Sequence, residues 1–225
     1  MTYTWLLIDA DDTLFDYSLA ENKALRSTFE QFGQAYCSQY LQIYQVFNRQ
    51  VWEGYERGEI STSELRLTRF RLLFDKTSIS IDPQDFSQHY LENLSHASDL
   101  FPSTTDVLKE LSGRYHMALV TNGLKDVQRP RLEHSAIRSF IEKTFISEEM
   151  GVAKPAVGFF EAVFREIGFP AKSDVLIIGD SLTSDMQGGI NYGIDTCWFN
   201  LAGKTSSLPV TYMIIKFGQL LEILN

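Results

Sequence analysis

Hydrophobic and polar positions divide the chain into two regions of different periodicity. Residues 5–8 form a run of four apolar positions, a length typical of a strand buried on both faces of a sheet. From residue 16 to residue 98, apolar positions recur three and four residues apart without strand-like alternation, so this region predicts a block of helices. The helices expected there span residues 20–32, 40–55, 65–74 and 83–94, the third of them capped by Ser61 or Thr62 with Glu64 as the acid of a capping box.

From residue 101 onward, short apolar runs alternate with helical stretches, the pattern of a parallel sheet with crossover helices. The strands expected here span residues 117–120, 144–146, 175–178, 196–199 and 212–215. The helices expected here span residues 105–113, 156–167 with Pro155 at its start, 184–192 and 219–224, besides a helix after Gly123 that Pro130 interrupts or restarts. The strand at residues 5–8 belongs with these later strands. We therefore expect residues 16–98 to be an insertion that leaves the sheet and returns to it.

The charge balance limits the kind of partner. The chain carries 29 acidic and 20 basic residues and a net charge of -9, so it repels polyanions and lacks the basic stripe of a nucleic-acid groove. We exclude DNA and RNA polymers as main partners, whereas a metal and one lysine can still attract a small phosphorylated molecule. No apolar run reaches the ~20 residues of a membrane span, and no signal peptide is visible. We expect a soluble cytoplasmic protein in which Cys37 and Cys197 are half-buried, reduced small hydrophobes.

Carboxylates crowd at the end of the first apolar run. Asp9, Asp11 and Asp12 lie within four positions directly after it. At the end of a buried strand such groups repel one another, and they persist only if a cation or hydrogen-bond donors balance them. A divalent metal held by oxygens is the natural partner, with Mg²⁺ as the default ion. The other polar clusters of the chain also follow strands, at the edge where open parallel sheets bind ligands.

These clusters carry a resemblance to a known family. The stretch D-A-D-D-T at residues 9–13 resembles the D-x-D-x-T motif of the haloacid dehalogenase-like (HAD) phosphohydrolases. The remaining motifs of that family are matched in order by Thr121-Asn122-Gly123, by Lys154, and by Asp180 with Asp185. The resemblance covers the whole chain and implies an α/β fold, with a Rossmann-like core at residues 1–15 and 99–225 and a C1-type α-helical cap at residues 16–98.

The later motifs also make physical sense. A hydroxyl and the N–H groups of a turn before a helix form a phosphate cradle, which is the role expected of Thr121 and Asn122. Lys154 is expected to neutralise the carboxylates and the phosphoryl oxygens. Asp180 is expected to bind the metal directly. For Asp185, two interpretations stay open: a charge that complements a helix N-terminus, or a group around the metal.

The resemblance implies a mechanism. Asp9 would attack phosphorus to form an aspartyl-phosphate, while Asp11 would act as general acid and then as general base. Mg²⁺ would be held by the carboxylates of Asp9 and Asp180 and by the backbone carbonyl of Asp11, and the Thr13 hydroxyl would hold the turn. Asp11 also separates this chain from the dehalogenases, P-type ATPases and phosphonatases of the same fold, which lack an acid at that position. A phosphate-ester hydrolase or a phosphomutase is left.

A narrower resemblance concerns the substrate. Residues 51–61, 146–155 and 189–194 resemble the bacterial pyrimidine 5'-nucleotidase subgroup, which favours a nucleoside monophosphate as substrate. The aromatic residues that can either stack on a base or pack within the protein are Phe15, Tyr17, Trp52 and Tyr55. A sugar phosphate or phosphoglycolate phosphatase, a phosphomutase and a non-catalytic phospholigand-binding regulator stay open as alternatives. The oligomeric state is not predicted.

Overall fold

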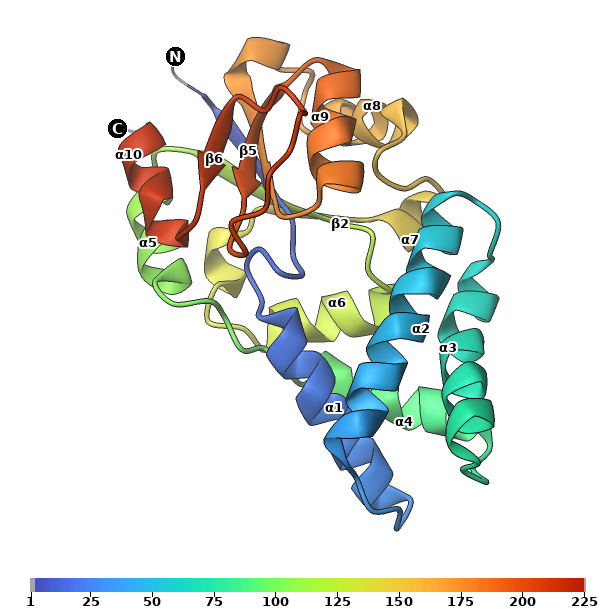
Figure 1. The fold of residues 1–225 in the computed structure, drawn as a ribbon. Helices are drawn as coiled ribbons and strands as arrows, with labels where there is room; N and C mark the ends of the chain where they lie inside the picture. Colours follow the sequence, from blue (N-terminus) through green and yellow to red (C-terminus); the bar gives the residue numbers. More distant parts are fainter. Residues whose placement is uncertain (1–2, 225) are drawn as a thin grey trace. The chain divides into compact units, whose positions relative to one another are not determined.

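A six-stranded parallel sheet forms the centre of one of the two units of the protein within residues 3–224, which the computed structural model describes (Figure 1). The strands are β1 (Trp5–Ile8), β2 (His116–Thr121), β3 (Lys143–Ile146), β4 (Val175–Gly179), β5 (Asp195–Phe199) and β6 (Tyr212–Ile214). Their order across the sheet is β3-β2-β1-β4-β5-β6, and every neighbouring pair is parallel. The predicted α/β architecture is therefore confirmed, with the first apolar run as a central strand.

Helices cover both faces of the sheet (Figure 1). They are α5 (Thr104–Leu111), α6 (Lys125–Glu133), α7 (Ser147–Met150), α8 (Val157–Glu166), α9 (Gln187–Tyr192) and α10 (Leu220–Leu224). Leu6 and Ile8 of β1 point into the hydrophobic cluster that contains α5 and α10. Trp5 and Leu7 point into the opposite cluster, beneath α8 and α9. This alternation buries β1 on both faces, as its apolar run predicts.

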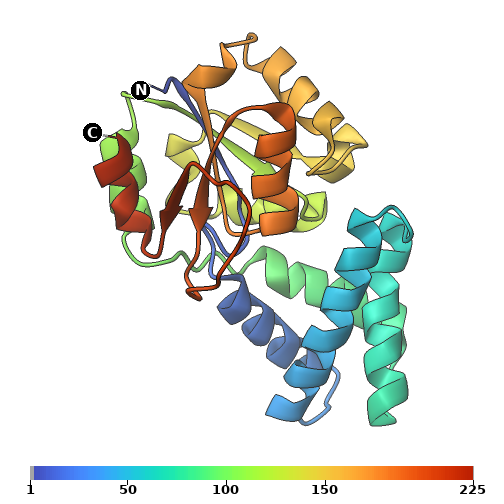
Figure 2. The same cartoon turned by 45° about the horizontal axis from the view of Figure 1, so that its top comes forward.

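The chain divides into two compact units, one of residues 1–17 with 98–225 and one of residues 18–97. The second unit is helical and contains α1 (Tyr17–Gln31) from its second residue, α2 (Ser38–Glu56), α3 (Thr62–Thr77) and α4 (Pro83–Ser95). Figure 2 shows α2 and α3 lying side by side. The rings of Phe29, Phe70 and Phe86 pack together in its interior. The capping box predicted before α3 is present, since Ser61 and Glu64 each accept a backbone N–H of the other.

The structure corrects several local expectations. α6 continues through Pro130, although that position lacks an N–H donor, because the helix buries Val127 and Leu132 against the core. α8 begins at Val157, so Pro155 lies just outside it, before the N-cap Ala156.

Three further differences concern one helix and the two cysteines. The helix expected at residues 184–192 is a π-helical turn, Leu182–Met186, followed by α9. Neither cysteine is half-buried: Cys197 is fully buried in β5 and Cys37 is exposed. Within residues 3–224, no helix has the length and apolar character needed to cross a membrane.

Candidate functional site

The site lies at the carboxyl ends of the central strands. Ile8 at the end of β1 pairs with Leu119 of β2 on one side and with Ile178 of β4 on the other. Asp9 and Asp180 follow the ends of β1 and β4, and the backbone N–H of Asp9 donates to the Ile178 carbonyl at 2.9 Å. β1 is the strand from which the order of the sheet runs in opposite directions, and ligands bind at such switch points in open α/β sheets.

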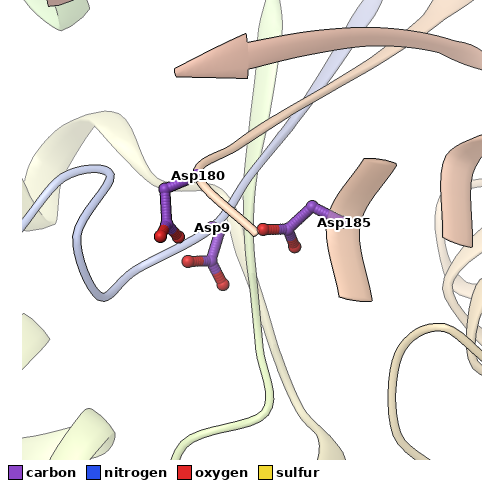
Figure 3. A group of neighbouring side chains, drawn as sticks. All are labelled: Asp9, Asp180 and Asp185. Atoms are coloured by element: carbon purple, nitrogen blue, oxygen red, sulfur yellow. The ribbon is translucent and has the colours of Figure 1, made fainter. Parts of the chain in front are cut away.

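Three carboxylates meet at this switch point (Figure 3). Asp9, Asp180 and Asp185 each offer an oxygen, and these atoms all lie within 4.8 Å of one another. Burial, together with the charge of Asp185, raises the pKa of Asp9 to about 8. Burial, together with the charge of Asp9, raises the pKa of Asp180 to about 9. Shifts of this direction mean that the group needs a cation to hold its negative charges, and three carboxylate oxygens suit a hard ion such as Mg²⁺.

Lys154 supplies part of the positive charge. Its Nζ donates to Asp9 Oδ1 at 2.6 Å, to Asp185 Oδ1 at 2.6 Å and to the Val120 carbonyl at 2.8 Å. The side chain is 1 % exposed. Burial alone lowers the pKa of Lys154, but the charges of Asp185 and Asp9 outweigh it and the net shift is upward. Lys154 is therefore a buried, charged ammonium that joins two of the carboxylates.

The T-N-G turn fixes the position of Lys154. The side chain of Asn122 accepts the backbone N–H of Lys154 at 2.9 Å and donates to its carbonyl at 2.8 Å. Thr121 is buried, and its Oγ1 accepts the N–H of Gly123 at 3.0 Å. The side chain of Asn122 thus holds Lys154, a role that its sequence position did not indicate, and the backbone N–H expected at the phosphate is not used by these bonds.

Asp185 is locked in place by two donors. Its Oδ1 accepts from Lys154 and its Oδ2 accepts the backbone N–H of Ser181 at 3.1 Å. It is fully buried, and Gly179 faces it so closely that a Cβ there would lie 2.2 Å from Asp185 Oδ2. Both interpretations left open for Asp185 have a contact in the structure. As a charge at a helix N-terminus, it accepts the N–H of Ser181, the N-cap of the π-helical turn. As a group around the metal, it has an oxygen within 4.8 Å of oxygens of Asp9 and Asp180. Nearby, the indole N–H of Trp198 donates to the Asp180 carbonyl at 2.9 Å.

The carboxylate of Asp11 lies outside this group and has its own partners. Gln128 Nε2 donates to Asp11 Oδ2 at 2.6 Å, and Arg131 Nη1 donates to Asp11 Oδ1. Both partners lie on α6, and neither is among the site residues expected from the sequence. The available signal was weak: two polar residues three apart on a helix share one face.

The turn after β1 explains the remaining polar residues of the first motif. Asp12 adopts a left-handed conformation with φ of 54°, which Asp tolerates better than most residues. The hydroxyl of Thr13 is buried and has no hydrogen-bond partner among the described residues, so the expected bond that holds the turn is absent there. Phe15 is fully buried in the core cluster and is not available to stack on a base.

A sequence model of the family described as "haloacid dehalogenase-like hydrolase" matches residues 6–199. The chain is 35% identical over 229 residues to the pyrimidine 5'-nucleotidase PynA of Streptococcus pneumoniae, covering 100% of this chain and 96% of that protein. It is 30% identical over 200 residues to the pyrimidine 5'-nucleotidase YjjG of Escherichia coli, covering 89% of this chain and 87% of that protein.

A solved structure agrees over the same length. The crystal structure of the HAD-hydrolase YfnB of Bacillus subtilis, described as bound to magnesium and as revealing interdomain movement, matches with a TM-score of 0.94. The two chains are 34% identical, and the match covers 100% of each. The family match and the full-length relatives lead to one conclusion: this chain belongs to the haloacid dehalogenase-like hydrolase family.

Proposed function

We propose that the protein is a Mg²⁺-dependent phosphomonoesterase that acts on nucleoside 5'-monophosphates, with pyrimidine nucleotides preferred. The observation that carries this proposal is the buried ammonium of Lys154 between Asp9 and Asp185, next to Asp180. The ammonium favours the ionised form of the nucleophile Asp9, and the three carboxylates form a group that can hold one more cation. The names of PynA and YjjG, which are pyrimidine 5'-nucleotidases, support the substrate class.

The donor set fits a magnesium ion. The carboxylates of Asp9 and Asp180 and the backbone carbonyl of Asp11 would hold it, with Asp185 close by. When bound, the ion supplies positive charge to the phosphoryl oxygens. Residues 1–15 and 99–225 would form the catalytic core and residues 16–98 the cap.

The residues of this chain then divide the chemistry among them. An Asp9 oxygen attacks phosphorus and forms an aspartyl-phosphate, while the bond from phosphorus to the leaving oxygen breaks and that oxygen takes the proton of Asp11. In the second step Asp11 takes a proton from water, and the water oxygen attacks phosphorus and releases Asp9 and inorganic phosphate. The Thr121 hydroxyl and the backbone N–H of Asn122 bind the phosphoryl oxygens, and the ammonium of Lys154 neutralises part of their charge. Such a site acts by positioning and charge stabilisation.

The test is phosphate release with Mg²⁺ across nucleoside 5'-monophosphates, sugar phosphates and phosphoglycolate. UMP, dUMP or dTMP should be the preferred substrates, EDTA should silence the enzyme, and Mg²⁺ should restore it. Asp9→Asn should abolish turnover, whereas Asp106→Asn, the same change at an exposed position on α5, should keep it.

Other outcomes would each remove part of the proposal. Turnover by Asp9→Asn would refute covalent catalysis. A preference for sugar phosphates or phosphoglycolate would keep the mechanism and discard the nucleotide substrate. Silence across the whole panel would refute the phosphatase and favour a phosphomutase or a non-catalytic binding protein.

A further inference from the structure

Two side chains of α6 converge on the carboxylate of Asp11. Arg131 Nη1 donates to one oxygen and Gln128 Nε2 donates to the other, the latter at 2.6 Å. Arg131 is fully buried and Gln128 is 2 % exposed, whereas the side chain of Asp11 is 29 % exposed. Each oxygen of the Asp11 carboxylate therefore accepts a bond from a buried side chain, while part of the carboxylate stays accessible to solvent.

A buried arginine at this place is costly for the fold. The guanidinium lies 5.2 Å from the ring of Phe15, and its Nε and Nη2 have no hydrogen-bond partner among the described residues. Removing such a group from water costs several kcal/mol, and an apolar residue of similar volume often serves stability as well or better. The contact with Asp11 is therefore the interaction that accounts for a buried arginine at this position.

The T-N-G turn is shaped to admit Gln128. A Cβ at Gly123 would lie 2.2 Å from Gln128 Nε2 and 2.9 Å from its Cδ. Any side chain at residue 123 would thus push the amide away from its present position. The absence of a side chain at Gly123 therefore leaves the space that the amide of Gln128 occupies next to Asp11, and this observation is independent of the hydrogen bonds.

We propose that Arg131 and Gln128 are positioning residues that fix the carboxyl group of Asp11 for proton transfer to the leaving oxygen and from the attacking water. The inference rests on the proposed function, in which Asp11 gives a proton to the leaving oxygen. A carboxyl group on a turn is free to rotate, and a misplacement of about 1 Å can cost ~10²-fold in rate. Two donors on a packed helix remove that freedom, since Gln128 and Arg131 lie three residues apart on one face of α6.

The experiment compares substrates whose leaving groups need different amounts of help from an acid. A nucleoside 5'-monophosphate expels a poor leaving group, whereas p-nitrophenyl phosphate expels a stable phenolate that needs little protonation. In Asp11→Asn, Arg131→Met and Gln128→Met, kcat/KM for the nucleotide should fall about 10²-fold or more, with a loss below about tenfold for p-nitrophenyl phosphate. Arg129→Met is the matched control, because Arg129 lies on the same helix and pairs with the half-exposed Glu149.

A structural role would give a different result. A folding defect lowers the amount of active enzyme, so it reduces the activity toward both substrates by the same factor. The inference would be overturned if Arg131→Met and Gln128→Met lost equal activity toward the two substrates, or if they lost none. If Arg131→Met does not fold, Gly123→Ala and Gln128→Met decide the question, since Gly123→Ala displaces Gln128 without removing a polar group. An Asp11→Asn variant with equal losses for the two substrates would instead show that Asp11 is not the general acid and would overturn the inference, whereas a wild-type enzyme that releases no phosphate from the nucleotide would refute the proposed function.

Discussion

Replacing Lys154 by Met removes the ammonium that joins Asp9 to Asp185. Its Nζ lies 2.6 Å from an oxygen of each, and with 1 % of the residue exposed, water cannot take its place. Removing one partner of a buried ion pair typically costs about 3–5 kcal/mol, because the other charge, at pH 7 that of Asp185, is left uncompensated. We expect the metal-free variant to lose about 3 kcal/mol of its free energy of unfolding at pH 7.

The loss should grow with pH. Burial and Asp185 raise the pKa of Asp9 to about 8 while Lys154 lowers it, so without Lys154 that pKa is higher still. Below pH 8 Asp9 is protonated in both proteins, and the difference between them is smallest. At pH values between the pKa of Asp9 in the wild type and its higher pKa in the variant, folded Lys154→Met keeps the Asp9 proton that the folded wild type has released. In that window the wild type gains about 1.4 kcal/mol over the variant per pH unit.

Urea unfolding in EDTA at pH 7 and pH 9.5 measures both quantities. Tryptophan fluorescence reports on the sheet-containing unit through Trp5 and Trp198 if every protein also carries Trp52→Phe, which removes the signal of α2. Lys109→Met, at an exposed lysine of α5, is the control. Saturating Mg²⁺ should reduce the difference in the free energy of unfolding between Lys154→Met and the wild type. An unchanged stability, or a loss of equal size at both pH values, would refute the reasoning.

Three further predictions concern the metal and the two units. Mg²⁺ affinity, measured by calorimetry, should rise with pH up to pH 8, about tenfold per pH unit for each proton released. Asp9 and Asp180, with pKa values of about 8 and 9, are protonated below pH 8 and must lose these protons to bind the ion. An affinity that does not change with pH would contradict this prediction. Gly179→Ala should cost about 1–3 kcal/mol and weaken Mg²⁺ binding, because its Cβ would meet Asp185; full retention of both would contradict it. Ser61→Ala should cost about 1 kcal/mol in thermal or urea unfolding, and no change would mean that the capping box adds nothing.

Matched substitutions separate these effects from the side-chain change itself. Gly218→Ala adds the same methyl group where nothing lies within 4 Å of the new atom, so it should leave Mg²⁺ binding intact. Ser80→Ala removes an exposed hydroxyl between α3 and α4 and should leave unfolding unchanged.

The elements of the fold that depend on local pattern were predictable. Apolar runs of four residues marked β1 and β4, and the polar residues that follow them marked the edge of the sheet that holds the carboxylates. The local rule failed at Pro130, where burial of the helix against the core outweighs the missing N–H donor. Packing decides such a position, and packing is not visible in the neighbouring residues.

The directions of side chains were harder to predict than their places. The bond from Arg131 to Asp11 joins residues 120 positions apart, and the bonds between Asn122 and Lys154 span 32 positions. A sequence shows that these residues are polar and lie near strand ends or on a helix. It does not show which way each side chain turns, because that depends on the distant segment that meets it.

The central place of β1 has a consequence for how the protein is made. Trp5 pairs with His116 on one side and with Val175 on the other, so the strand that leads into Asp9 lacks its second neighbour until most of the chain has been synthesised. At about 5–20 residues per second, its four apolar residues wait roughly ten to thirty seconds for β4 to emerge from the ribosome. The helical unit of residues 18–97 has all of its partners long before then. We expect β1 to be the segment that chaperones shield on the nascent chain, and the carboxylate group at its end to be among the last parts of the molecule to form.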